Sequence, residues 1–292
     1  MPKTLLKNAN VRPDRIFMLF VASLCAAAPA LAQADRPASG SVFDGDWVTL
    51  GIGAALSPSY SGSDDYVLSP APLITGSVAG IDFRPRAAGL ELDLVPDSNN
   101  ARIGIIGGFG INGNFDRTSR IKDPVVSLLG QLDTAIEVGP VAGVQVNRLL
   151  NPFDSLSAEV ALGFDVAGAH DGGVVSPSLT YFTPVSRSAV VTLAVSADWI
   201  DDKYAGYYYN VSPAGSAASG LPVFSAKGGW KSASATLLSV YDLDGNVTNG
   251  GFSLFAIGNY SRLLGDAKRS PITSIRGSAD QWFGAVGVGY TF

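Results

Sequence analysis

The chain has 292 residues but one cysteine, one histidine and only 15% charged residues. Cys25 lies near the start, so the chain beyond it has no thiol for a disulfide or a thiolate metal site. No apolar run reaches the roughly 18 residues that a membrane-spanning helix requires, which excludes helical spans. The net charge of −5 argues against nucleic acid as a partner, because nucleic acid binds basic surfaces.

The first 32 residues have the pattern of a cleaved secretory signal peptide. Basic residues come first (Lys3, Lys7, Arg12 and Arg15), and an apolar run over 16–24 follows them. Ala30-Leu31-Ala32 then provides a cleavage site of small residues. Leu24 is too large for the position before a lipid-modified Cys25, which argues against a lipoprotein. We expect removal of residues 1–32 and a flexible periplasmic lead-in over 33–46.

The body of the chain alternates apolar and polar residues with a period of two. The clearest segment is 189–199, where one face carries Ala189, Val191, Leu193, Val195, Ala197 and Trp199. Segments 88–95, 131–138 and 157–167 alternate in the same way. Transmembrane strands show this pattern over about ten residues. A soluble antiparallel sandwich shows it too, with the apolar face turned inward.

The last segment favours the membrane alternative. Within 281–292, Trp282, Val286, Val288, Tyr290 and Phe292 share one face, and small residues occupy the other. An apolar face that ends on phenylalanine is typical of the closing strand of an outer-membrane barrel. Aromatic residues near other strand ends (Trp47, Trp199, Tyr241, Tyr260) match interfacial girdles. We therefore predict an all-β fold, a single transmembrane antiparallel β-barrel over 47–292 in the bacterial outer membrane.

Twelve strands are predicted, with ten or fourteen as the alternatives. They cover 47–57, 68–77, 81–95, 101–112, 129–138, 141–150, 156–167, 174–183, 188–200, 228–242, 250–262 and 281–292. An even number places both ends of the barrel in the periplasm. The long segments 58–67, 201–227 and 263–280 then become outer loops. Segment 113–128 becomes the longest periplasmic connection.

No motif in the chain predicts catalysis, and no catalytic, cofactor-binding or metal-binding residue is assigned. Gly108-Phe-Gly-Ile-Asn-Gly113 matches a dinucleotide pattern, but no helical periodicity follows it. A lipid hydrolase would need His170 beside both a serine and an acid. His170 lies in a glycine-rich predicted outer loop, which indicates a solvated side chain.

Charged residues inside predicted strands should face the lumen of the barrel. The acidic ones are Glu91, Asp93, Glu137, Glu159, Asp165 and Asp198, and the basic candidates are Arg102, Arg148 and Lys231. Such side chains either line a narrow water-filled pore or pair and fill the interior. The outer segment 201–211 is rich in tyrosine, which indicates an aromatic girdle and a folded loop, or a surface for protein or glycan contacts.

Several short motifs resemble the MipA/OmpV family of outer-membrane proteins. They include Tyr204-x-x-Tyr207-Tyr208-Tyr209-Asn210-Val211, Pro58-x-Tyr60-Ser-Gly62-Ser63, Leu263-Leu264-Gly265-Asp266-Ala267, Ser270-Pro271-Ile272 and the ending Tyr290-Thr-Phe292. Their order extends over about 47–292. Asn210 and Lys268-Arg269 depart from the family pattern, which puts loop-specific interactions in doubt but not the barrel.

The resemblance implies a non-enzymatic scaffold. The namesake of the family bridges a lytic transglycosylase and a bifunctional murein synthase, so partners of that kind are expected at the periplasmic face, besides outer-membrane lipid. Segment 113–128 is the predicted docking surface. Two other functions stay open: a narrow pore for small solutes, and a surface adhesin that acts through 201–227 and 263–280. No cofactor is expected.

Overall fold

The computed structural model describes residues 40–86, 88–96 and 101–292, and the predicted signal peptide lies outside them. Twelve antiparallel strands form a closed barrel in which each strand pairs with its neighbours in the sequence and β1 pairs with β12. The strands are β1 (Trp47–Pro58), β2 (Tyr66–Val78), β3 (Ile81–Arg86), β4 (Gly89–Asp93), β5 (Ile103–Asn114), β6 (Ala135–Asn147), β7 (Ser155–Asp165), β8 (Gly173–Pro184), β9 (Ala189–Ile200), β10 (Gly229–Asp242), β11 (Gly251–Leu263) and β12 (Asp280–Thr291). The predicted fold class is confirmed.

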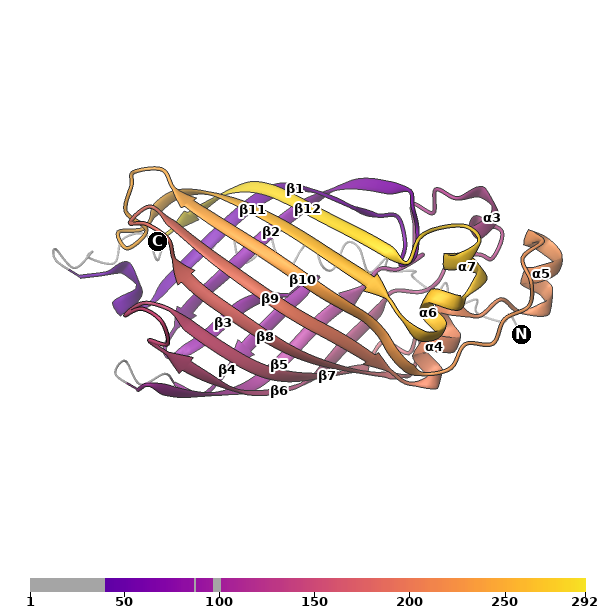
Figure 1. Ribbon diagram of the computed structural model, residues 1–292, viewed down its shortest axis with the longest axis horizontal. Coiled ribbons are helices and arrows are strands. Elements are labelled where there is room, and N and C mark those ends of the chain that lie inside the picture. The colour runs from indigo at the N-terminus through magenta and orange to yellow at the C-terminus, as the bar shows by residue number, and fades with distance from the viewer. Residues whose placement is uncertain (1–39, 87, 97–100) are drawn as a thin grey trace, which may run out of the picture.

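Short helices gather at one end of the barrel (Figure 1). They are α3 (Pro124–Ser127), α4 (Asp202–Tyr209), α5 (Pro213–Ser219), α6 (Gly265–Arg269) and α7 (Pro271–Ser274), while a 3-10 turn, η1 (Val42–Asp44), precedes β1 at the opposite end. The start of β1 and the chain's last residues share that opposite end (Figure 1). In bacterial barrels this end is periplasmic and carries short turns, whereas long loops face outward. The helical end is therefore the outer end.

The outward face of the wall is apolar along its whole circumference. Large side chains such as Ile52, Ile105, Leu193 and Val286 are exposed there, while their strand neighbours are turned inward. Aromatic residues gather near both rims, with Tyr260 against Trp282 toward the outer end and Phe252 against Tyr290 toward the periplasmic end. An apolar band between two aromatic girdles is the surface that a barrel presents to a bilayer. None of the helices in the described residues is long and apolar enough to cross a membrane.

Two predicted strand boundaries are wrong, and their errors cancel in the count. The predicted strand 81–95 is a hairpin of two strands, β3 and β4. The predicted strands 129–138 and 141–150 are largely one strand, β6, which runs through Gly139-Pro140. The number of strands therefore stays at twelve. Between these two places, however, the chain crosses the membrane in the direction opposite to the predicted one, so the connections there lie on the opposite side of the membrane. Segment 113–128 accordingly lies at the outer end, and its predicted periplasmic docking role is wrong.

Glycines inside the barrel make room for an inward-facing phenylalanine. A Cβ atom added to Gly287 would lie 2.3 Å from the ring of Phe255, and one added to Gly51 would lie 3.2 Å from the same ring. The ring of Phe255, which is buried, therefore packs against the backbone of β1 and β12. This contact helps to fix the register at which the first and last strands close the barrel.

Gly287→Ala is expected to destabilise the folded barrel by about 1–3 kcal/mol, because the added methyl group would lie 2.3 Å from the Phe255 ring and 2.5 Å from the carbonyl oxygen of Ile52. Gly284→Ala, on the same strand, is the matched control, since its Cβ would meet nothing closer than 3.9 Å. The measurement is the midpoint of urea unfolding in micelles, followed by heat-modifiable gel mobility. Equal midpoints for the two variants would contradict this packing.

Candidate functional site

The lumen contains a cluster of ion pairs on one side, contributed by β3, β4 and β7. Arg84 donates to Asp93 at 2.8 Å and to Glu159 at 3.2 Å, and Arg86 donates to Glu91 at 3.0 Å. The side chains of Glu91 and Asp93 are almost fully buried, whereas both arginines are partly accessible. We call these five residues the charged wall. Three carboxylates face two guanidinium groups, so the wall has an excess of negative charge.

A second polar layer lies closer to the outer end of the lumen. Glu137 accepts hydrogen bonds from the side-chain amides of Asn112 and Asn114. The amide of Gly172 donates to Nδ1 of His170 at 3.0 Å, so the ring proton resides on Nε2, which donates to Glu137 at 3.4 Å. The His170 side chain has no exposed surface. The predicted solvated histidine is therefore wrong: His170 is a buried structural group.

Lys231 completes this layer. Its ammonium group lies 3.3 Å from Asp198 and 5.3 Å from the centre of the Tyr204 ring. Asp198 also accepts hydrogen bonds from Ser176 at 2.7 Å and from Ser232 at 3.0 Å. Every charge in this layer thus has an opposite charge or a hydrogen-bond donor beside it, as burial in a barrel requires.

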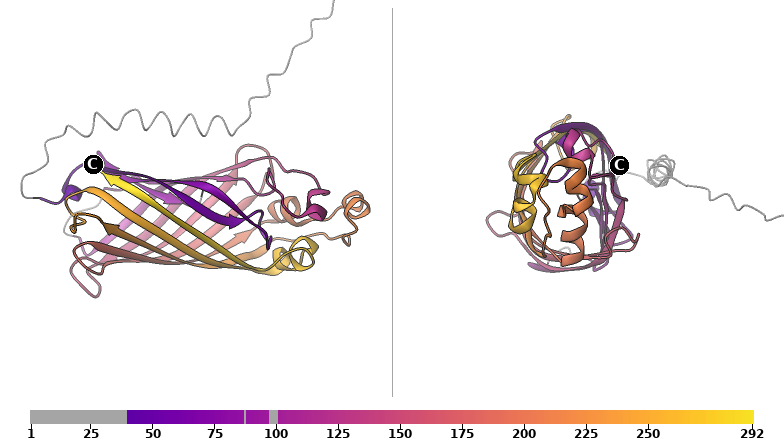
Figure 2. Two further views of the ribbon diagram at one scale, coloured as in Figure 1. Left: turned by 90° about the horizontal axis from the view of Figure 1, so that it is seen from above. Right: turned by 90° about the vertical axis from the view of Figure 1, so that its right-hand side faces the viewer.

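Four loops at the outer end pack together into one body that lies across the mouth of the barrel (Figure 2). We call it the outer cap, and it comprises 59–65, 115–134, 201–228 and 264–279. Asp201 begins α4 by accepting from the amide of Tyr204, Asp123 begins α3 through the amides of Val125 and Val126, and Ser212 begins α5. Capping residues of this type satisfy helix amides that would otherwise stay unpaired.

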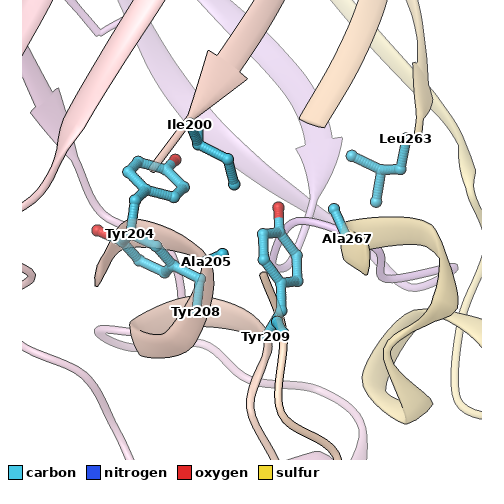
Figure 3. Close-up of a cluster of buried hydrophobic side chains, with 8 residues drawn as sticks. Ile200, Tyr204, Ala205, Tyr208, Tyr209, Leu263 and Ala267 are labelled. Carbon is cyan, nitrogen blue, oxygen red and sulfur yellow. The ribbon is translucent and has the colours of Figure 1, made fainter. Parts of the chain in front are cut away.

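The core of the outer cap is aromatic (Figure 3). Tyr204, Tyr208 and Tyr209 of α4 are buried and pack against the strand ends at Ile200 and Leu263. The His170 ring contacts Tyr204 at 4.8 Å and Tyr208 at 5.7 Å between ring centroids. Because these rings point inward, the tyrosine motif builds the cap and does not offer an exposed aromatic surface.

Two arginines tie the loops of the cap to one another. Arg117 is buried and donates to the carbonyl oxygen of Tyr208 at 3.0 Å, which joins 115–134 to α4. Arg276 donates through Nε and Nη2 to one oxygen of Asp123, at 3.0 and 2.7 Å. Burial acts to raise the pKa of Asp123, but the bonds from Arg276 and the helix amides outweigh it and hold that pKa below its ordinary value.

Of the other charged residues that the sequence indicated, Arg102 and Arg148 lie outside the lumen, whereas Asp165 faces inward at its outer rim. Arg102 and Arg148 precede and follow strands at the periplasmic turns, so their predicted lumenal position is wrong. Asp165 ends β7 directly opposite Glu137, and its outward neighbours Phe164 and Val166 are exposed, so its predicted inward orientation is confirmed. Its carboxylate accepts from the amides of Ala167, His170 and Asp171, which orders the loop after β7. The glycine motif 108–113 lies within β5, without the helix that a dinucleotide site requires. Nowhere in the described chain do three His, Cys, Asp or Glu side chains gather to hold a metal ion.

Sequence reasoning missed the residues that hold the cap. Arg117, Asp116, Asp123 and Arg276 sit in loops with no periodic pattern, and their partners are distant in sequence. Gln281 is a further example, because it accepts from the amide of Gly62 and donates to the carbonyl of Ser63. The only available signal was the Asp123-Pro124 pair, which is a common helix start.

A closed antiparallel barrel with an apolar outward face, a polar interior and long outer loops defines a transmembrane protein of the outer-membrane type. The model of the family described as MltA-interacting protein MipA matches residues 50–292, and the chain belongs to that family.

The chain is also similar to several solved structures, among them two outer-membrane channels and a transporter. An outer-membrane channel from Pseudomonas putida F1 is 14% identical, with a TM-score of 0.39, 89% of this chain and 100% of that chain covered. The outer-membrane channel DcaP of Acinetobacter baumannii is 11% identical, with a TM-score of 0.37 and coverages of 85% and 72%. The toluene transporter TodX of Pseudomonas putida is 10% identical, with a TM-score of 0.35 and coverages of 85% and 89%. No curated protein matches.

Asp123→Asn and Arg276→Gln are each expected to loosen the outer cap and to speed its cleavage severalfold, because each removes one charge of the ion pair between them. Limited proteolysis of 115–134 in micelles measures the effect, and the double variant should be no more sensitive than either single one. Additive sensitivities would mean that the two side chains act independently. Arg262→Gln, an exposed ion pair with Asp280 at the rim, is the control and should leave cleavage unchanged.

Asp116 makes the stability of the outer cap depend on pH in the sense opposite to that of Asp123, whose pKa is lowered. Burial raises the pKa of Asp116 to about 6, despite the amide of Ser61 and the nearby Arg117. A raised carboxyl pKa stabilises the fold below the unfolded value of about 4, and this contribution is lost as pH rises through about 6. Asp116→Asn should therefore stabilise the cap at pH 7.5 and change little at pH 4. Near-UV circular dichroism of the tyrosine cluster during heating measures this, and equal gains at both pH values would contradict it.

Proposed function

We propose that the protein is a non-enzymatic anchor in the outer membrane that presents its periplasmic end to enzymes of murein turnover, after export and cleavage of residues 1–32. One observation carries this proposal: the outer cap lies across the mouth of the barrel and is tied by Arg117 and by the Asp123–Arg276 pair. A barrel covered in this way is suited to anchoring partners more than to free diffusion through its axis. Membership of the MltA-interacting family supports partners of the lytic transglycosylase kind.

The periplasmic turn 148–154 is the best docking surface. Asp154 accepts from the amides of Leu149, Leu150 and Asn151 and from the hydroxyl of Tyr181, which fixes the shape of the turn. Leu150 and Phe153 are nevertheless 78% and 73% exposed. A rigid turn that displays two apolar side chains offers a small anchor for a partner, since little conformational entropy is lost on binding.

Anchoring would act through concentration. Two enzymes that each bind the same barrel, or neighbouring barrels, are confined to a thin layer beneath the outer membrane. Their encounter then becomes effectively intramolecular, and weak contacts suffice to assemble them. No catalytic contribution from the barrel is needed for this role.

A narrow pore is the second candidate. The charged wall and the layer around Glu137 and Lys231 place polar side chains along the lumen, as a water-filled channel would require. In a planar bilayer, steady cation-selective steps from the wild-type protein would favour the pore. A folded barrel without conductance would favour the anchor.

Leu150→Ser combined with Phe153→Ser is expected to reduce capture of a membrane-bound lytic transglycosylase at least tenfold, because the exposed apolar anchor is lost. Leu128→Ser, which changes a 57% exposed residue of the outer cap, is the matched control and should bind as the wild type does. Binding is measured with purified proteins in micelles, and gel mobility confirms that each variant is folded. Undiminished capture by the double variant would sink the proposed docking surface.

A further inference from the structure

The barrel wall has a seam between β2 and the β3–β4 hairpin. The ladder between β2 and β3 comprises three residue pairs, Gly76–Phe83, Ser77–Asp82 and Val78–Ile81. On its other side β2 pairs with β1 along twelve residues, from Tyr66 to Ser77. Within the described residues, no strand pairs with β2 on the β3 side from Tyr66 to Thr75. The wall is therefore closed near the periplasmic end and unpaired over the outer part of β2.

Side chains replace the missing strand at both ends of the seam. Arg120 donates to the carbonyl oxygen of Leu68 at 3.2 Å, and the ammonium group of Lys122 donates to that of Tyr66. At the inner end, the hydroxyl of Thr75 donates to the carbonyl oxygen of Phe83 at 3.2 Å, one residue beyond the last ladder pair. Charged and polar side chains of this kind are a common way to cover a strand edge.

Three prolines turn their missing donors toward the seam. Backbone groups of an antiparallel strand point alternately to its two neighbours. Tyr66 and Leu68 use their carbonyls on the seam side, so Pro70 and Pro72 have the same orientation. By the register of Gly76 with Phe83, Pro85 of β3 also faces β2. Proline is tolerated in a sheet where its nitrogen meets no partner strand, which makes this edge a built feature of the sequence.

The seam separates two different halves of the lumen. Beside β2, the inward residues of β1, β11 and β12 are uncharged, with Leu73 and Phe255 packed over Gly51 and Gly287. Beside β3, the charged wall begins at Arg84 and Arg86. An amphipathic molecule that entered between the two halves would meet an apolar surface on one side and ionic groups on the other.

The charged wall favours a cationic head group. Its carboxylates outnumber its guanidinium groups, and Oε1 of Glu91 is buried without a hydrogen-bond partner, 3.7 Å from Arg84. A buried carboxylate oxygen without a donor is costly, and an ammonium group would satisfy it. We propose that the seam is a lateral entrance through which amphipathic amines pass from the outer leaflet of the membrane into a binding site on the charged wall.

A lateral route is consistent with the position of the outer cap, which lies across the axial mouth (Figure 2). It also agrees with the lipid-facing surface beside the seam, where Leu68 is 69% exposed. Backbone at membrane depth that lacks a partner strand is tolerated only where it borders protein or a water-filled cavity. If the seam is an entrance, the unpaired edge of β2 borders a water-filled opening and not the lipid.

The test uses two fluorescent probes with the same alkyl chain, one ending in an amine and the other in a carboxylate, added to the protein in micelles. The amine is expected to bind at least tenfold more tightly than the carboxylate. Glu91→Gln and Glu159→Gln should each weaken amine binding at least tenfold, and gel mobility verifies folding. Equal affinity for the two probes, or preference for the carboxylate, would overturn the site.

The route is tested by a bulky maleimide attached to Pro85→Cys, because Cys25 is the only native cysteine and lies in the leader. Val286→Cys, outward-facing and 64% exposed on β12, carries the same label as the control. Amine association should slow at least tenfold with the label at residue 85 and less than twofold with the label at residue 286. Association at the same rate in both labelled proteins would exclude lateral entry. The binding site itself is judged separately, by the comparison of the amine and carboxylate probes.

Discussion

The structure depends on one constraint: backbone amides and carbonyls inside a bilayer must find hydrogen-bond partners within the protein. A closed ladder of strands satisfies this requirement almost everywhere. The pairing of β1 with β12 closes the barrel through eight residue pairs, from Thr49 to Leu56 of β1. Closure in turn fixes which residues face lipid, since a shift by one residue would turn every side chain to the other face. The apolar wall, the polar lumen and the side of each loop all follow from that register.

Closure also explains the glycines that crowd the barrel. At Gly108 an added Cβ would lie 1.7 Å from the carbonyl oxygen of Leu92, and at Gly139 it would lie 2.2 Å from that of Leu162. In such a strongly staggered barrel, neighbouring backbones approach too closely for side chains at these points. These glycines serve close approach between strands, so they do not mark turns.

This is the physical reason for the errors in the predicted strands. Gly139-Pro140 has the composition of a turn, yet β6 continues through it, and the ladder with β7 is interrupted only between Val138 and Val141. The true hairpin tip between β3 and β4 has no Asn-Gly or Asp-Gly signal, so the sequence over 81–95 has the pattern of a single strand. Period-two alternation predicted the outward face of most strands correctly, because that pattern is local. It could not predict sides of the membrane, which depend on counting every turn.

The buried state of His170 escaped prediction for a related reason. Its neighbours Gly168, Asp171 and Gly172 indicate a solvated loop, and nothing nearby in sequence covers the ring. Burial comes from Tyr204 and Tyr208, which α4 brings from a distant outer loop, and from Glu137 on β6. The tyrosine motif was visible in the sequence, but its role as the roof over a buried histidine required the three-dimensional arrangement.

The outer cap and the seam together determine how the lumen can be reached, because the cap covers the mouth and the seam leaves a gap in the wall. A barrel whose mouth is covered by packed loops would be sealed if its ladder were complete, and then its lumenal charges would serve structure alone. Pro70, Pro72 and Pro85 prevent completion, because each removes a donor that a full β2–β3 ladder would use. In a fully paired wall, any other residue at these positions would supply a backbone N–H for a hydrogen bond to the neighbouring strand. The three missing donors lie at the boundary between the uncharged and the charged half of the lumen. This coincidence indicates that the gap in the β2–β3 ladder serves the function of the barrel.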